Sequence, residues 1–199
     1  LPEVSSIRLK LSRIEISSLS QESYHFRAKE SVRVIAYVYF GLTILETIAL
    51  WISGMNLFDA VCHSFATIAT GGFSTRNNSI ASYDSVLIET IIIIFMTLSA
   101  LNFGMIFLLV AKGSLMLFKS PVTRYFLSVL LLGSILVSLN LGLTKTYDSL
   151  GESFRFGFFQ TISLATSTGF ASADSSMWPN FAILLLIFFT LQCACSGST

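Results

Sequence analysis

Charged residues are scarce in this chain. Asp, Glu, Lys and Arg make up 12% of its 199 residues, against roughly 25% in a typical soluble domain. Hydrophobic residues make up 53% and the mean hydropathy is +0.75, so the chain is predicted to lie in a lipid bilayer. The net charge is only +1, and so small an excess gives no reason to expect a nucleic-acid partner.

Cysteine is also scarce. The 3 cysteines, Cys62, Cys193 and Cys195, lie in apolar stretches, where the usual role is that of a small buried hydrophobic residue. We expect no disulfide framework. Neither a His nor a second Cys pair accompanies Cys193 and Cys195 at zinc spacing, so no metal site is predicted there. The chain begins with Leu1 and shows no signal-peptide pattern, so we expect it to be part of a longer protein.

Long apolar runs are abundant instead. Three of them, residues 34–52, 90–111 and 125–143, reach the roughly 20 residues that a membrane-spanning helix needs. A fourth run begins at Met177 and carries no charge to the end of the chain, but residues 193–199 are small and polar. The sequence therefore predicts an all-α integral membrane fold.

Two uncharged stretches between these runs are interrupted by glycine and hydroxyl residues. They cover residues 60–75 and 156–173, and each is predicted to be a half-helix followed by extended backbone. Lipid cannot satisfy free N–H and C=O groups, so irregular backbone at membrane depth must be buried in protein or line a water-filled path. The two stretches therefore indicate a pore.

The two stretches also resemble each other. Residues 58–73 and 154–170 share an aromatic start, an apolar middle, Ala-Thr and then Gly-Phe, with a slip of one residue. Since apolar runs flank both, the pattern predicts a helix, re-entrant pore loop, helix unit that occurs twice. We divide the chain into a cytoplasmic or interfacial segment (1–32), a pore repeat (33–112), a cytoplasmic loop (113–123) and a second pore repeat (124–199) truncated in its last helix. Segment 1–32 has both helical and strand-like apolar spacing, so its structure stays open.

Basic residues predict the orientation. Most of them fall on one side of the predicted membrane: Arg8, Lys10, Arg13, Arg27, Lys29, Arg33, Lys112, Lys119 and Arg124. The positive-inside rule places this side in the cytoplasm and both re-entrant loops on the outer side. Six acids are expected on the outer side, where they would concentrate cations: Asp59, Asp84, Glu89, Asp148, Glu152 and Asp174.

Each loop carries a motif suited to binding a dehydrated cation. Main-chain carbonyls can replace the water shell of such an ion, and glycine allows the unusual backbone conformations that this requires. Gly72 and Gly169 are the expected pivots. Helices predicted at 57–68 and 152–164 precede the motifs, with acids near their starts and their negative ends toward the ion path. One Thr-Gly-Gly-Phe sequence alone would more often be an ordinary turn, but two copies in matched contexts favour a filter.

Residues 57–74, together with Asn102-Phe103, resemble the second repeat of the TrkH family in the Trk/Ktr/HKT superfamily of potassium transporters. Residues 165–170, Ala173-Asp174, Trp178-Pro179 and 195–199 resemble the third repeat. The resemblance covers the chain from about Arg33 onward and is specific, because both loop motifs occur in order.

The resemblance implies potassium uptake through a channel-like pore of four repeats, two of them present here, with K⁺ as the transported ion and no covalent cofactor. It also implies a bacterial inner-membrane location, a homodimer and a cytoplasmic nucleotide-binding regulatory ring of the TrkA type. The implied filter residues are Thr70, Gly71, Gly72, Phe73, Ser167, Thr168, Gly169 and Phe170. The implied gate loop is Cys195, Ser196, Gly197, Ser198 and Thr199, with cysteine and serine where the family has more glycine.

Parts of the sequence also fit two other functions. A secondary transporter could bind a small organic anion at the positive ends of broken helices, but acids stand at the helix starts here. An intramembrane enzyme could use Asp59 and His63, with Cys62, but no second polar cluster completes a site. We therefore expect no enzyme. Glu46, inside the first span, is expected to face the protein interior or a cavity.

Overall fold

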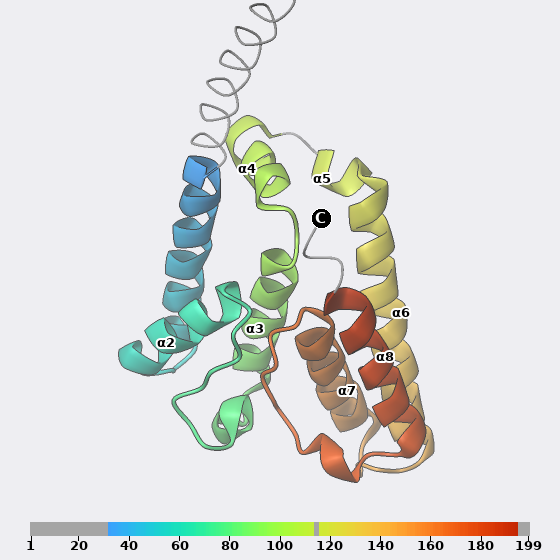
Figure 1. Ribbon diagram of the computed structural model, residues 1–199. Coiled ribbons are helices and arrows are strands. Elements are labelled where there is room, and N and C mark those ends of the chain that lie inside the picture. Colours follow the sequence, from blue (N-terminus) through green and yellow to red (C-terminus); the bar gives the residue numbers. More distant parts are fainter. Residues whose placement is uncertain (1–31, 114–115, 195–199) are drawn as a thin grey trace, which may run out of the picture.

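The computed structural model describes residues 32–113 and 116–194, and over these residues the chain is helical, without strands. Figure 1 follows it from the blue helix at Val32–Ile52 to the red helix α8. The elements after the blue helix are α2 (Leu57–Ile68), η1 (Ser79–Tyr83), α3 (Val86–Ser99), α4 (Phe103–Lys112), α5 (Met116–Lys119), α6 (Pro121–Leu143), α7 (Leu150–Ala165), η2 (Ser175–Met177) and α8 (Asn180–Ala194).

Among the described residues, two helices are long and apolar enough to cross a membrane, Val32–Ile52 and α6. They confirm the spans predicted at 34–52 and 125–143. Helix α6 begins four residues earlier than predicted because Pro121 occupies its first turn. Proline is favoured there, since its fixed φ suits a helix and its missing N–H would have had no partner.

The span predicted at 90–111 is wrong as a single helix. The chain forms α3 and α4 with a break between them, and their axes are bent by 104°. The cause is Asn102, whose side chain accepts a hydrogen bond from the Met105 N–H and so starts a new helix. Asparagine is among the best residues for this capping position. Asn102 is thus the cap of α4.

Both short helices that precede the loops are present. Helix α2 has the predicted bounds, and α7 extends one or two residues further at each end than predicted. Asn56 caps α2 by accepting from the Asp59 N–H, and Ser149 caps α7 by accepting from the Glu152 N–H. In each case the acid in the first turn also suits the positive helix end.

Buried apolar side chains from both halves of the chain form one core cluster. Ile88, Ile92 and Met96 of α3 pack with Phe159 of α7 and with Phe170 beyond it. Two smaller clusters lie between α6 and α8 and beside α4 and α5. The shared core fixes α7 against α3, and it therefore fixes the two loop regions relative to each other.

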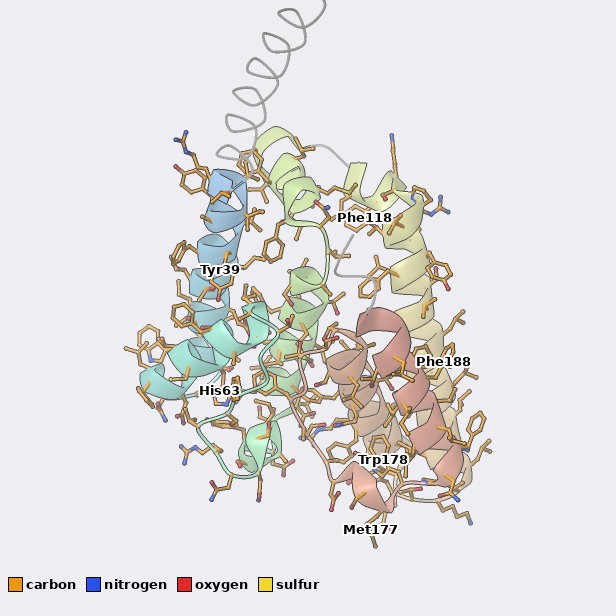
Figure 2. The ribbon with its side chains drawn as sticks, in the orientation of Figure 1. Tyr39, His63, Phe118, Met177, Trp178 and Phe188 are labelled. Carbon is orange, nitrogen blue, oxygen red and sulfur yellow. The ribbon has the colours of Figure 1, made fainter. Side chains whose placement is uncertain are left out.

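The molecule has two distinct ends in Figure 2. Phe118 of α5 marks one end, and Met177 and Trp178 mark the other. The connections that follow α2 and α7 both run toward the Met177 end in Figure 1. Nearly all of the predicted segment 1–32 and the whole predicted gate loop, 195–199, lie outside the described residues.

Candidate functional site

The chain leaves α2 in a tight turn. Three successive N–H groups after the helix donate to carbonyls of its last turn, while Thr70 and Gly72 adopt positive φ values of 49° and 63°. The pairs are Ala69 to Phe65 (3.0 Å), Thr70 to Thr67 (3.0 Å) and Gly71 to Ala66 (2.7 Å).

The chain leaves α7 in the same way. Ser167 and Gly169 have positive φ values of 58° and 87°, at the positions that correspond to Thr70 and Gly72. The hydrogen bonds also correspond, from Thr166 to Ile162 (2.9 Å), Ser167 to Leu164 (3.0 Å) and Thr168 to Ser163 (2.9 Å). The resemblance found in sequence is therefore also a resemblance in backbone conformation.

The turns leave several main-chain oxygens without a donor. Within the described residues, no hydrogen bond ends on the carbonyls of Thr70, Gly71, Gly72, Phe73, Ser167, Thr168 or Gly169. The carbonyl of Phe170 differs, because it accepts the Ser163 hydroxyl at 2.7 Å. Unpaired carbonyls are the ligands that suit a dehydrated cation, so seven of the eight predicted filter residues offer one.

The two loops touch each other at Gly72. A Cβ atom built on Gly72 would overlap the Thr168 carbonyl oxygen and would lie 3.0 Å from the carbonyl carbon of Gly169. Gly72 therefore needs to be glycine for two reasons, its positive φ and the main chain packed against it. The two predicted pivots, far apart in sequence, are neighbours in space.

The segments that follow the loops are also joined. The Ala81 N–H donates to the Ala171 carbonyl at 3.1 Å, and the Ala171 N–H donates to the Ser79 hydroxyl at 3.2 Å. These bonds link η1 to the chain just after Phe170.

His63 of α2 lies behind the first loop and is fully buried; Figure 2 labels it beside the connection that follows α2. One ring nitrogen, Nδ1, is 2.7 Å from the Asp59 carbonyl, and Nε2 is 2.9 Å from the Ser74 hydroxyl. The His63 ring also lies 5.8 Å from that of Phe170, which follows the second loop. Burial lowers the pKa of His63, so the neutral ring is favoured, with Nδ1–H as donor and Nε2 as acceptor.

Asp59 ties the first turn of α2 to the chain that follows the first loop. Its carboxylate accepts the Thr75 hydroxyl at 2.6 Å, the Tyr83 hydroxyl at 2.8 Å and the Arg76 guanidinium at 2.9 Å. These hydrogen bonds, that of Thr75 first, hold the pKa of Asp59 far below its usual range. Asp59 therefore acts as a charged anchor, and His63 is a buried, hydrogen-bonded ring. Neither contact set is that of an acid–base pair.

Arg155 of α7 joins the two halves of the chain. Its guanidinium is 2.8 Å from one carboxylate oxygen of Glu89 and 3.0 Å from the other, and it is 2.9 Å from Asp84. The Glu89 side chain is only 3% exposed. Sequence reasoning missed this bridge, although Arg155 was visible as the one basic residue within the helix predicted at 152–164.

Metal coordination by side chains has no support in the described part of the chain, where no three His, Cys, Asp or Glu residues cluster. The ligands on offer are main-chain oxygens at the ends of two short helices, between helices apolar enough for a membrane. The class of protein that this arrangement defines is an α-helical integral membrane protein with two matched glycine loops.

Comparison with known proteins gives the family. The sequence profile of the TrkH family, described as cation transport protein, matches residues 1–199. The chain belongs to the TrkH family. This membership agrees with the expectation of an all-α membrane protein that is not an enzyme.

Individual relatives agree. The Trk system potassium uptake protein TrkH of Salmonella typhimurium is 38% identical over 174 residues, which are 87% of this chain and 36% of that protein. TrkH of Halomonas elongata is 38% identical over 202 residues, covering 100% of this chain and 42% of the relative. The crystal structure of the potassium transporter TrkH from Vibrio parahaemolyticus matches with a TM-score of 0.78 at 37% identity, over 82% of this chain and 36% of that one. The chain thus spans well under half the length of these relatives.

Proposed function

We propose that the full-length protein carries potassium into the cell through a pore whose filter includes the loops Thr70 to Phe73 and Ser167 to Phe170. The observation that carries this proposal is the contact of two matching glycine loops that present unpaired carbonyls. Its relatives are named potassium uptake proteins, which supports the identity of the ion.

The chemistry follows from the carbonyls. An ion that enters the filter loses water and gains main-chain oxygens, which attract it without the fixed charge of a carboxylate that would hold it too tightly. The carboxyl ends of α2 and α7 lead directly into the loops, and helix ends of this kind carry a partial negative charge. Both features favour a cation over an anion.

The contact at Gly72 supports a ring of repeats. Gly72 of the first loop touches Thr168 of the second, so the two surfaces in contact are unlike. The corresponding face of Gly169 is open, since a Cβ there would meet nothing within 4 Å. Contacts between unlike surfaces continue from one unit to the next until a ring closes. The open face of Gly169 is the place for the next of the four repeats.

The proposal includes an orientation in the bacterial inner membrane with both loops on the outer side. Arg76 and Arg155 neutralise Asp59 and Glu89. Three further acids at this end are exposed: Asp148 and Asp174 on connections, and Glu152 in the first turn of α7. Such acids would attract cations to the outer mouth.

Three further parts of the proposal rest on the family resemblance alone. They are a gate at Cys195, Ser196, Gly197, Ser198 and Thr199, pairing of the full-length protein as a homodimer, and binding of a cytoplasmic nucleotide-binding ring of the TrkA type. The gate residues lie outside the described part of the chain.

One observation favours the alternative of a secondary transporter for a small solute, namely the broken helix pair α3 and α4. The free N–H groups of a helix start within a membrane can bind an anion. At the start of α4, however, the Met105 N–H already donates to the Asn102 side chain. This makes α4 a poorer anion site and leaves ion conduction as the better account.

The test is potassium uptake, and its preference over sodium, in transport-deficient cells that express the full-length protein. Gly72→Ser and Gly169→Ser are expected to lower uptake and weaken the preference. Gly113→Ser is the matched control, because Gly113 has a φ of 60° and open space around it but lies outside both loops. Unchanged uptake and preference in both loop variants would contradict the filter assignment.

A further inference from the structure

Glu46 is a buried carboxyl that the pore loops do not use. It lies in the helix Val32–Ile52 and is 0% exposed. Neither of its carboxyl oxygens has a hydrogen-bond partner among the described residues. A carboxyl group inside a membrane span is costly, and when ionised it needs a donor or a positive partner.

The hydroxyl groups beside Glu46 direct their hydrogens to main-chain carbonyls, although that of Thr67 lies close enough to the carboxyl for a weak interaction. Thr43 lies one turn away on the same helix, and Thr67 of α2 faces Glu46 from the other side. Each of these hydroxyls donates its hydrogen to a carbonyl four residues earlier, Thr43 to Tyr39 and Thr67 to His63, at 2.8 Å in both cases. A hydroxyl that has donated can still accept, so the surroundings of Glu46 offer acceptors rather than donors.

Charged groups nearby do not supply a positive partner. Helix α2 packs on the first helix through Thr47 and Ser64, whose hydroxyls are 2.6 Å apart, and α3 shares a core cluster with Leu50, one turn from Glu46. The titratable residues of α2 and α3 are Asp59, Cys62, His63 and Glu89. Asp59 and Glu89 are paired with arginines, His63 is engaged by Ser74 and the Asp59 carbonyl, and Cys62 carries no positive charge.

The last turn of α2 also disfavours a negative charge on Glu46. Thr67 belongs to that turn, and the carboxyl end of a helix carries a partial negative charge. A carboxyl surrounded by acceptors and by a negative helix end can be satisfied by a proton, since the neutral acid becomes a hydrogen-bond donor. A bare alkali cation would need several oxygens and room between them, whereas Glu46 is closed from solvent.

We propose that Glu46 is a proton-binding site that fastens the first helix to α2. In the folded protein Glu46 carries the proton and its O–H donates toward α2. When the medium becomes alkaline the proton passes to hydroxide, and the carboxylate left behind is repelled by the acceptors and by the end of α2. Since α2 leads directly into the loop at Thr70, the loss of this proton loosens the pore loop.

The test compares Glu46→Gln, Glu46→Met and Glu46→Asp in the purified full-length protein. Infrared spectra are expected to show a protonated carboxyl band in the wild type at neutral pH that Glu46→Gln lacks. Relative to Glu46→Gln, the melting temperature of the wild type is expected to fall as the pH rises from the ordinary carboxyl pKa of about 4.3 into the alkaline range, because only the unfolded chain releases the Glu46 proton there. Neither readout depends on transport, so the test stands apart from the proposed function.

A comparison of how the three Glu46 variants fold also tests the proposal. Glutamine keeps a donor and methionine keeps the apolar volume, so both are expected to fold and Gln to be the more stable. If Gln and Met both fail to accumulate while Asp is stable, the carboxylate charge is required and the proposal is overturned. A melting temperature that rises with potassium or sodium in the wild type but not in Glu46→Gln would overturn it in favour of a bound cation. The same infrared spectrum for wild type and Glu46→Gln would also overturn it.

Discussion

The two glycine loops follow the same main-chain course but meet different neighbours. Gly72 is packed against the Thr168 carbonyl, whereas the same face of Gly169 is open. The phenylalanines that end the two loops differ in exposure as well. Phe73 is 82% exposed, whereas Phe170 is 0% exposed. The duplicated motif therefore keeps the same hydrogen bonds and backbone angles in both copies. The contacts of each copy depend on its place in the order of repeats.

The largest loss of potassium uptake is expected from alanine at Gly72, the loop glycine that is packed against main chain. Gly72→Ala places a Cβ on the Thr168 carbonyl oxygen, and overpacking of this kind costs about 1–3 kcal/mol in addition to the positive-φ strain. We expect potassium uptake to fall by about tenfold or more, the equivalent of about 1.4 kcal/mol. Gly169→Ala carries only the backbone strain, about 1–2 kcal/mol, and is expected to lose less.

Uptake assays on the two alanine variants, normalised to the amount of protein in the membrane, give the comparison. An equal loss at both positions would show that another part of the full-length protein closes the face of Gly169. A larger loss at Gly169 would contradict the difference between the loops.

The arginines outside the two loops offer a second comparison. Arg155 pairs with Glu89, whose side chain is 3% exposed, while Arg76 is itself 50% exposed. Arg155→Met leaves a buried carboxylate unpaired, and we expect it to destabilise the protein by about 3 kcal/mol. Arg76→Met is expected to cost less than about 1 kcal/mol, because Thr75 and Tyr83 still donate to Asp59.

Thermal unfolding of the full-length protein in detergent measures this difference. The double variant Arg155→Met with Glu89→Gln serves as a control and is expected to recover part of the stability, since it removes the unpaired charge. Similar melting temperatures for the two arginine variants would rule out a special role for the bridge between the halves.

The smallest effect on stability is expected from a mild lowering of the pH. Burial lowers the pKa of His63, so the folded state favours the neutral ring more than the unfolded chain does. This contribution is fully present above the ordinary histidine pKa of about 6.5, and it is lost as the pH falls below that value and through the lowered pKa of the folded state. The melting temperature should therefore fall on mild acidification, and His63→Gln should make that fall smaller.

His25→Gln is the matched control, because the chain has 2 histidines. The control is expected to keep the pH dependence of the wild type. If His63→Gln leaves the pH dependence of the melting temperature unchanged, the His63 ring is not the group that destabilises the protein in acid.

Local signals explain what the sequence could predict. The helix over 57–68 was found with its observed bounds because Asp59 marks its start and Thr-Gly-Gly its end. The loops were found because glycine and hydroxyl residues interrupt apolar stretches. The break before α4 was missed because the apolar run continues on both sides of Asn102; a reading of Asn102 as a helix cap would have found it.

Long-range contacts explain what the sequence could not predict. The Arg155–Glu89 pair joins residues 66 apart in the chain, and no local pattern selects Glu89 over the other acids. The contact of Gly72 with Thr168 depends on how α3 packs on α7, which is a property of the shared core and not of either loop. The same holds for Asn140 of α6, whose buried Oδ1 has no partner among the described residues.

The bonds between Ser79, Ala81 and Ala171 bear on how the protein is made. Ser79 and Ala171 are 92 residues apart, so the ribosome releases η1 well before the segment that completes it. During that interval the N–H of Ala81 and the main chain around Gly72 lack the partners that they have in the folded chain. The first loop therefore reaches its final contacts only after the second half of the chain has been made.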